Sequence, residues 1–114
     1  MPLTNAPRLH SEELILRGPE LQDAEPIIAF LQDERRSRGF GHLPERGAAW
    51  RWFALNVGHW HIHGYGYFTI ETEAGEIAGI SGIWNPETWP EPELGWVVFE
   101  GFEGRGIAYE AACR

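Results

Sequence analysis

The sequence predicts an α+β domain built on a mixed, mostly antiparallel sheet. Two observations support this fold class. Between positions 19 and 64 the apolar residues recur at the three- and four-residue spacing of helices, and from position 65 they alternate or form short β-branched runs, as in strands. The elements follow in the order strand, two helices, three consecutive strands and a helix. This order favours helices packed beside an antiparallel layer over a doubly wound sheet.

The first half of the chain is expected to contain one strand and two helices. Residues 1–11 look like a flexible leader, and residues 12–17 form a short apolar run that suits a strand. A helical pattern begins at Pro19, and Pro26 inside it is expected to kink the helix or to split it into two. A second helical pattern runs from about residue 44 to Gly64, which is suited to end it. The residues with helical spacing in it are Trp50, Phe53, Ala54, Val57 and Trp60. Most of the set Phe30, Leu31, Trp50 and Phe53 is expected to lie in the core rather than to contact a substrate.

The second half is expected to contain three consecutive strands, at residues 65–71, 77–84 and 93–99. The segment 73–76 resembles a hairpin turn. The segment 85–92 holds three prolines and is expected to be an irregular loop. After the last strand, a glycine-rich turn leads into a helix that begins at Ile107.

Composition and charge limit the classes of function. At 114 residues the chain holds one domain at most. Its formal net charge of −8 argues against a nucleic-acid partner, which needs a basic surface. Cys113 is the single cysteine, so no internal disulfide can form, which fits a reducing cytoplasm. No apolar stretch approaches the roughly 20 residues of a membrane span, and residues 1–10 lack the apolar run of a secretory signal. A soluble, cytoplasmic protein without a membrane partner is therefore expected.

The glycine turn after the last strand is a candidate anion site. Gly104 and Gly106 allow the backbone to approach a ligand closely, and the following helix adds a partial positive charge at its N-terminus. Arg105 adds a full charge on a planar group that suits phosphate oxygens. A plain strand-to-helix turn would explain the same glycines. A Rossmann turn is disfavoured because that motif follows the first strand of its unit, and a P-loop is excluded because Gly-Lys-Ser/Thr is absent.

Five separate blocks of sequence extend this argument, at residues 58–68, 75–79, 82–86, 93–96 and 104–111. In their order and spacing the chain resembles the GCN5-related N-acetyltransferases (GNAT), and among them the RimJ/RimL-like branch, which modifies protein N-termini and small amines. The resemblance runs from about Leu14 to the last residue. It implies acetyl-CoA as co-substrate. It also implies that residues 12–114 are a truncated N-acetyltransferase domain without its C-terminal strands, either part of a longer enzyme or a naturally short relative.

The resemblance also implies which residues bind the donor. In the family, the strand before the glycine turn pairs its backbone with the pantetheine arm, and this strand corresponds to Trp96, Val97 and Val98. The pyrophosphate sits on the turn, which corresponds to Gly104, Arg105, Gly106, Ile107 and Ala108. The wider family prefers Gln or Arg three positions before the first of these glycines. This chain has Gly101 there, as members of this branch often do.

The implied reaction is direct transfer of an acetyl group to a primary amine. The amine must be neutral, and the thioester carbonyl must be polarised. Glu93, at the start of the last strand, is the candidate general base, acting through water. A solvated charge at a strand end is the alternative interpretation. The backbone N–H of Val97 or Val98 is the candidate group that polarises the carbonyl.

Other reactive side chains are given no catalytic role. His59, His61 and His63 lack the further ligands that would complete a metal site, so no metal is expected. Cys113 has no base nearby and is expected to be a small buried residue, not a nucleophile.

Two further questions stay open at the level of sequence. The six tryptophans can fill a core or line a pocket, and Trp84 and Trp89 either shape an acceptor pocket or pack a loop. The alternative function is a non-catalytic GNAT fragment or remnant that acts as a CoA-binding or interaction module. The missing strands would leave an open sheet edge, through which a homodimer could form.

Overall fold

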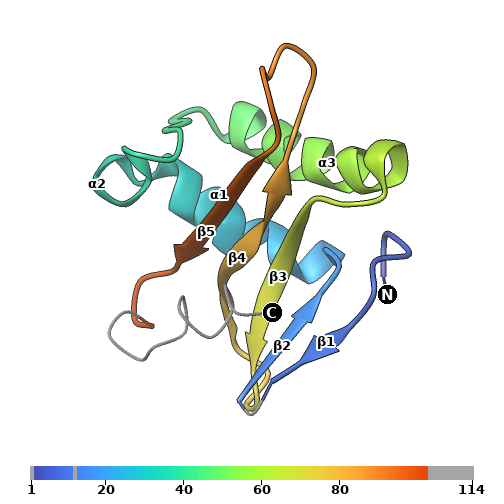
Figure 1. The fold of residues 1–114 in the computed structure, drawn as a ribbon. Helices are drawn as coiled ribbons and strands as arrows, with labels where there is room; N and C mark the ends of the chain where they lie inside the picture. The colour runs from blue at the N-terminus through green and yellow to red at the C-terminus, as the bar shows by residue number, and fades with distance from the viewer. Residues whose placement is uncertain (1, 12, 103–114) are drawn as a thin grey trace.

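A five-stranded antiparallel sheet in the order β1-β2-β3-β4-β5 forms the centre of the fold. The computed structural model describes residues 2–11 and 13–102. The strands are β1 (Leu9–His10), β2 (Leu14–Arg17), β3 (Tyr67–Thr72), β4 (Ile77–Trp84) and β5 (Glu93–Val98). The helices are the 3-10 turn η1 (Leu21–Asp23), α1 (Ala24–Gln32), α2 (Glu34–Ser37) and α3 (Arg46–His63). Figure 1 shows α1 and α3 behind the sheet, so both cover the same face.

This architecture confirms the predicted α+β class. β4 has the predicted bounds, and β3 and β5 lie within two residues of theirs. The turn between β3 and β4 also lies where the sequence predicts it, with Gly75 at a φ of 83°. Every strand pair in residues 2–11 and 13–102 is antiparallel. The helix expected from Ile107 lies outside the described residues.

The N-terminal segment differs from the flexible leader expected from its sequence. Leu9 and His10 form β1 and pair with β2, with Leu9 opposite Leu16. Further upstream, the Leu3 N–H donates to the Pro19 carbonyl at 3.3 Å, and the Leu3 side chain packs against the main core. The backbone of this segment thus pairs with groups of β2 and the following loop. A strand of two residues is too short to show the alternation from which strands are predicted.

Pro26 does not kink α1. It is the third residue of that helix, where the N–H would have no intrahelical partner, so proline is tolerated. The helical pattern does form two pieces, but they join between Asp23 and Ala24, before the proline. The short helix α2 was not expected. It begins after Asp33, whose side chain accepts a hydrogen bond from the Arg36 N–H at 3.2 Å.

α3 has about the predicted length, and the predicted apolar face is buried at Phe53 and Trp60 but not at Trp50. Gly64 ends it in the left-handed conformation, at a φ of 81°. Phe53 is buried, as its spacing predicts, but Trp50 is 49% exposed. Asn56 and His59 are buried in its place because both find hydrogen-bond partners on the neighbouring chain segment.

A buried ion pair fixes η1 against the sheet. The guanidinium of Arg17, at the end of β2, donates two hydrogen bonds of 2.9 Å to the fully buried carboxylate of Asp23. Its Nε also donates to Glu71 in β3 at 2.6 Å. Burial opposes the charge on Arg17, but these hydrogen bonds outweigh it and raise the pKa of the guanidinium above its ordinary value. The pair therefore positions the start of α1 over β2 and β3.

The main core lies between the helices and β3, β4 and β5. Its larger buried side chains are Ile27, Phe30, Leu31, Phe53, Tyr67 and Trp84. None of the helices in the described ranges combines the length and the apolar character that a membrane crossing requires.

Candidate functional site

Among the described strands, β5 is the last in the sheet. Its backbone N–H and C=O groups point alternately toward β4 and away from it. The Phe99 N–H donates to Ala78 in β4 at 2.8 Å. Since bonded and non-bonded pairs alternate along an antiparallel ladder, the backbone of Val97 also points toward β4, whereas those of Trp96 and Val98 point away from it. Of the three residues expected to pair with a pantetheine arm, Trp96 and Val98 thus face outward. The Val97 N–H faces the ladder and is not oriented toward a ligand at that edge.

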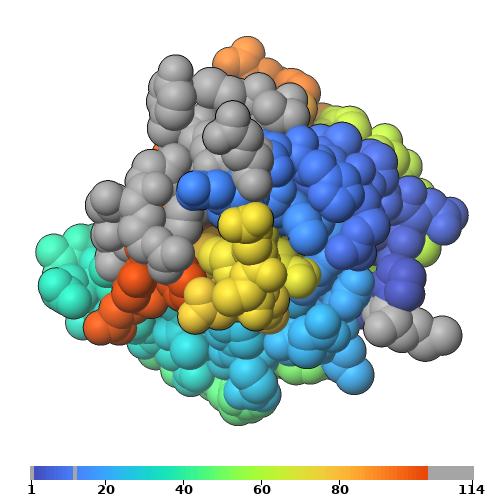
Figure 2. Space-filling model, turned by 90° about the horizontal axis from the view of Figure 1, so that it is seen from below, coloured from blue at the N-terminus to red at the C-terminus, as the bar shows by residue number. Residues whose placement is uncertain are grey.

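Arg36 of α2 contacts this outer edge. Its guanidinium Nη2 donates to the Val98 carbonyl at 3.0 Å, which confirms that this carbonyl points away from β4. Figure 2, seen from below, shows the segment after β5 (red) between α2 (turquoise) and the turn that joins β3 to β4 (yellow). A positive charge therefore lies beside the end of β5, just before the glycine-rich turn.

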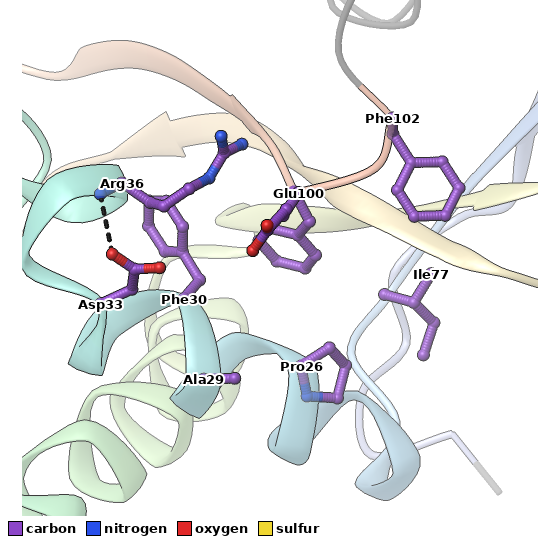
Figure 3. Close-up of a pocket in the computed structure, with 9 residues that line it drawn as sticks. Pro26, Ala29, Phe30, Asp33, Arg36, Ile77, Glu100 and Phe102 are labelled. Carbon is purple, nitrogen blue, oxygen red and sulfur yellow. Dashed lines mark hydrogen bonds between the residues drawn. The ribbon is translucent and has the colours of Figure 1, made fainter.

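A cavity of about 350 Å³ opens at this end of β5. Figure 3 shows Arg36 and Asp33 on one side of it, Ile77 and Phe102 on the other, and Glu100 between them. The lower wall comes from α1. The cavity is mostly apolar, with these charged groups at its rim. In the sequence, Phe102 of its lining comes shortly before the residues at which an anion site is expected.

A second cavity, of about 520 Å³, lies at the opposite end of β5, between that strand, α3 and the segment that joins α2 to α3. We call it the aromatic cavity. Its aromatic lining consists of Phe40, Trp52, Tyr67, Trp84, Trp89 and Trp96. Glu93 also lines it, at the first position of β5. Two residues singled out from the sequence for different roles, Glu93 and Trp96, thus border the same cavity.

Four of these rings form one continuous cluster. Trp52 stacks on Trp84 with ring centroids 5.2 Å apart, and Tyr67 lies 5.3 Å from Trp84 and 5.7 Å from Trp52. Phe40 makes edge contacts with Trp52 and Tyr67 at 5.6 and 5.7 Å. The tilted and edge arrangements are those that aromatic rings prefer. The inner wall of the aromatic cavity is therefore set by mutual packing of these rings.

Tyr67 is a candidate site residue that the sequence did not reveal. It stands in register with Gly82 of β4, which in turn pairs with Gly95 of β5. Its hydroxyl oxygen occupies the space that a Cβ on residue 95 would need. Burial, and then the charge of Glu93, raise the pKa of Tyr67 to about 12, so its hydroxyl stays protonated at neutral pH. Asn56 holds the Tyr67 backbone through hydrogen bonds of 2.9 and 3.1 Å.

His59 supports the cavity from behind. Its ring stacks on Trp84, with centroids 4.6 Å apart and an interplanar angle of 13°. Its Nε2 accepts from the Asn85 N–H at 2.9 Å, so its Nδ1 carries the proton and donates to the Tyr65 carbonyl at 2.7 Å. Burial lowers the pKa of His59, and His63 adds to this effect. Neutral His59 thus joins α3 to the loop after β4.

Two further points concern metal ligands and the expected pyrophosphate residues. No group of three or more side chains able to hold a metal ion gathers within residues 2–11 and 13–102. The expected pyrophosphate residues Gly104, Arg105, Gly106, Ile107 and Ala108, together with Cys113, lie outside the described residues.

Comparisons with known proteins agree with this architecture. The acetyltransferase from Agrobacterium tumefaciens str. C58 is 38% identical, with a TM-score of 0.80 over 93% of this chain and 62% of that one. A protein from Bordetella pertussis assigned to the GnaT family of acetyltransferases is 25% identical, with a TM-score of 0.75 over 93% of this chain and 66% of its own. The acetyltransferase (GNAT family) from Bacillus anthracis shares the fold at 18% identity, with a TM-score of 0.72 over 93% of this chain and 61% of its own.

The chain therefore spans less than two thirds of the length of each of these proteins. A comparison with curated proteins returned no match. The model of the acetyltransferase (GNAT) domain family matches residues 13–114. By this match, the chain belongs to the GNAT family of acetyltransferases.

Proposed function

We propose that the chain is an acetyl-CoA-dependent N-acetyltransferase that moves an acetyl group directly to a primary amine. The observation that carries the proposal is the position of the aromatic cavity. Its lining includes both Glu93, a candidate base, and Trp96, whose backbone faces the outer edge of β5. An amine in the cavity would thus lie beside a donor bound along that edge.

The donor is assigned to the outer edge of β5. GNAT proteins generally use acetyl-CoA, and the outward-facing backbone groups of Trp96 suit pairing with its pantetheine amides. The Val98 carbonyl accepts from Arg36, and the Val98 N–H faces the same edge. The pyrophosphate would bind at residues 104–108, with Arg36 near the end of β5 as a further positive group. Because the net charge of the chain repels an anionic donor, such local positive groups are needed.

In the proposed mechanism, Glu93 accepts a proton from the ammonium group of the acceptor through a water molecule. The neutral nitrogen then attacks the thioester carbonyl while the Val98 N–H polarises its oxygen. The carbon–sulfur bond breaks, and the departing thiolate takes up the proton that the nitrogen releases. The products are an N-acetylated amine and free CoA.

Membership of the RimJ/RimL-like branch is part of the same proposal. It is supported by the order of the five sequence blocks, and it would make protein N-termini or small amines the acceptors. The second candidate is a CoA-binding module without catalysis.

Calorimetry with acetyl-CoA, followed by an assay of thiol release over a panel of amines, tests the proposal. We expect saturable donor binding and amine-dependent release of CoA. Glu93→Gln should lower the rate at neutral pH and leave the donor affinity unchanged. Glu91→Gln, which changes a nearby exposed carboxylate outside the aromatic cavity, is the matched control.

Equal rates for the two variants would show that Glu93 is not the base. Donor binding without release for any amine would favour the non-catalytic module. Absence of donor binding would overturn both candidates.

A further inference from the structure

We propose that the acceptor in the aromatic cavity is a small primary monoamine with a flat aromatic body, of the arylalkylamine class. This inference rests on the proposed function, because it takes the aromatic cavity as the acceptor site. It goes further by selecting one kind of amine over peptides, polyamines and short alkylamines.

The shape of the wall favours a flat body. Trp52, Tyr67 and Trp84 pack on one another within 5.2 to 5.7 Å and form the inner surface. Nearer to solvent, Trp89 is 42% exposed. A planar ring entering between the inner wall and the indole of Trp89 would find ring faces and edges to pack against, whereas a linear alkyl chain would fill this space poorly.

The charges of the lining favour one ammonium group. Among the described residues that line the cavity, Glu93 has the only charged side chain. A second ammonium group, as in a polyamine, would find no second carboxylate in this lining to pair with. The carboxylate of an amino acid would find no cationic side chain there. Aromatic faces attract an ammonium ion, and the net charge of −8 raises the local concentration of cations.

The size of the cavity sets an upper limit. At about 520 Å³ it lies within the range that accommodates a small molecule of one or two rings. The hydroxyl of Tyr67, which stays protonated, provides a polar group near Glu93 that can orient the amine end. The ring would then point toward Trp89, and the nitrogen toward the outer edge of β5.

The test measures equilibrium binding by calorimetry in the presence of saturating CoA, so that no turnover occurs. The probes are 2-phenylethylamine and tryptamine. Two controls each remove one feature: 2-phenylethanol removes the charge, and n-butylamine removes the ring. A third control, spermidine, adds charges. A tripeptide with a free N-terminal serine represents the peptide alternative. We expect both arylalkylamines to bind at least tenfold more tightly than every control.

Two matched variants locate the site. Trp89→Ala should weaken the binding of 2-phenylethylamine severalfold. Trp50→Ala, which removes a similarly exposed indole outside the cavity, should leave this affinity unchanged. Glu93→Gln should weaken the binding of 2-phenylethylamine but leave the affinity for 2-phenylethanol unchanged. Equal affinity for the tripeptide or for n-butylamine would overturn the inference, as would equal effects of the two tryptophan variants.

The acetylation assay separates this inference from the proposed function. Selective binding of arylalkylamines without acetyl transfer would contradict the proposed function but would still support the inferred ligand class. Transfer to peptides or alkylamines at rates equal to those of arylalkylamines would support the proposed function and contradict the ligand class.

Discussion

The hydroxyl oxygen of Tyr67 lies over the backbone of Gly95, in the space that a Cβ on residue 95 would occupy. The two residues are separated by β4, where Gly82 stands in register with both. Because neither glycine has a side chain, the phenol ring can extend across the sheet toward β5. This arrangement brings a protonated hydroxyl to the strand that begins with Glu93.

Gly95→Ala should therefore displace the Tyr67 hydroxyl. The added methyl group overpacks a buried contact, and we expect a loss of about 1–3 kcal/mol in the free energy of unfolding. Urea denaturation measures this loss, and steady-state kinetics should show a higher KM for the acceptor. The control is Gly39→Ala, because Gly39 also lines the aromatic cavity but a Cβ there meets nothing within 4 Å. Equal effects of the two variants would contradict the prediction.

His59 should make the stability depend on pH. Its folded pKa is lowered by burial, so the unfolded chain binds a proton first as the pH falls. The stabilising contribution is complete above the unfolded pKa of about 6.5 and is lost as the pH falls through the folded pKa. Thermal melts between pH 8 and pH 5, roughly spanning that window, should show a smaller fall in Tm for His59→Gln than for the wild type. His61→Gln, at an exposed position of α3, should retain the wild-type slope.

Asp23→Ala should strongly destabilise the fold because it leaves the guanidinium of Arg17 buried without its main partner. Removal of one member of a buried pair costs about 3–5 kcal/mol. Denaturation in urea measures the loss. Glu25→Ala, which removes the partner of Arg46 at the surface, should produce no resolvable change. A small effect of Asp23→Ala would mean that Glu71 alone compensates the charge of Arg17.

Arg36→Ala should weaken acetyl-CoA binding roughly tenfold, as expected for the loss of one charge-assisted contact. Its guanidinium is held at the Val98 carbonyl, at the end of the strand that precedes the expected pyrophosphate residues in the sequence. Calorimetry at two salt concentrations should also show a reduced salt dependence. Arg46→Ala removes an equal charge from an exposed site on α3 and is the control. If both variants lower the affinity equally, Arg36 acts only through net charge.

Gly58→Ala should stabilise the chain by about 1 kcal/mol, because alanine has the higher helix propensity and a Cβ at this position meets nothing within 4 Å. Gly64→Ala should have the opposite effect and cost about 1 kcal/mol, since residue 64 has a φ of 81°. Melting curves of the two variants provide the comparison. Stabilisation by Gly64→Ala would show that α3 does not end in the left-handed cap.

The sequence alone was sufficient for features that depend on a few neighbouring residues. The hairpin between β3 and β4 follows from an alternating pattern broken by Gly75, and the end of α3 follows from Gly64. The start of β5 at Glu93 follows from the proline-rich segment before it. Such signals are local because backbone preferences and hydrophobic periodicity act within one element.

Only the tertiary structure decided which groups meet. Val98 rather than Val97 faces outward because the register with β4 fixes the direction of each hydrogen bond. Trp50 is exposed, whereas Asn56 is buried, because Asn56 finds the backbone of Tyr67, a partner that helical spacing cannot reveal. The aromatic cavity likewise combines residues from distant segments. Its geometry depends on non-local packing, which the periodicity of a single element does not specify.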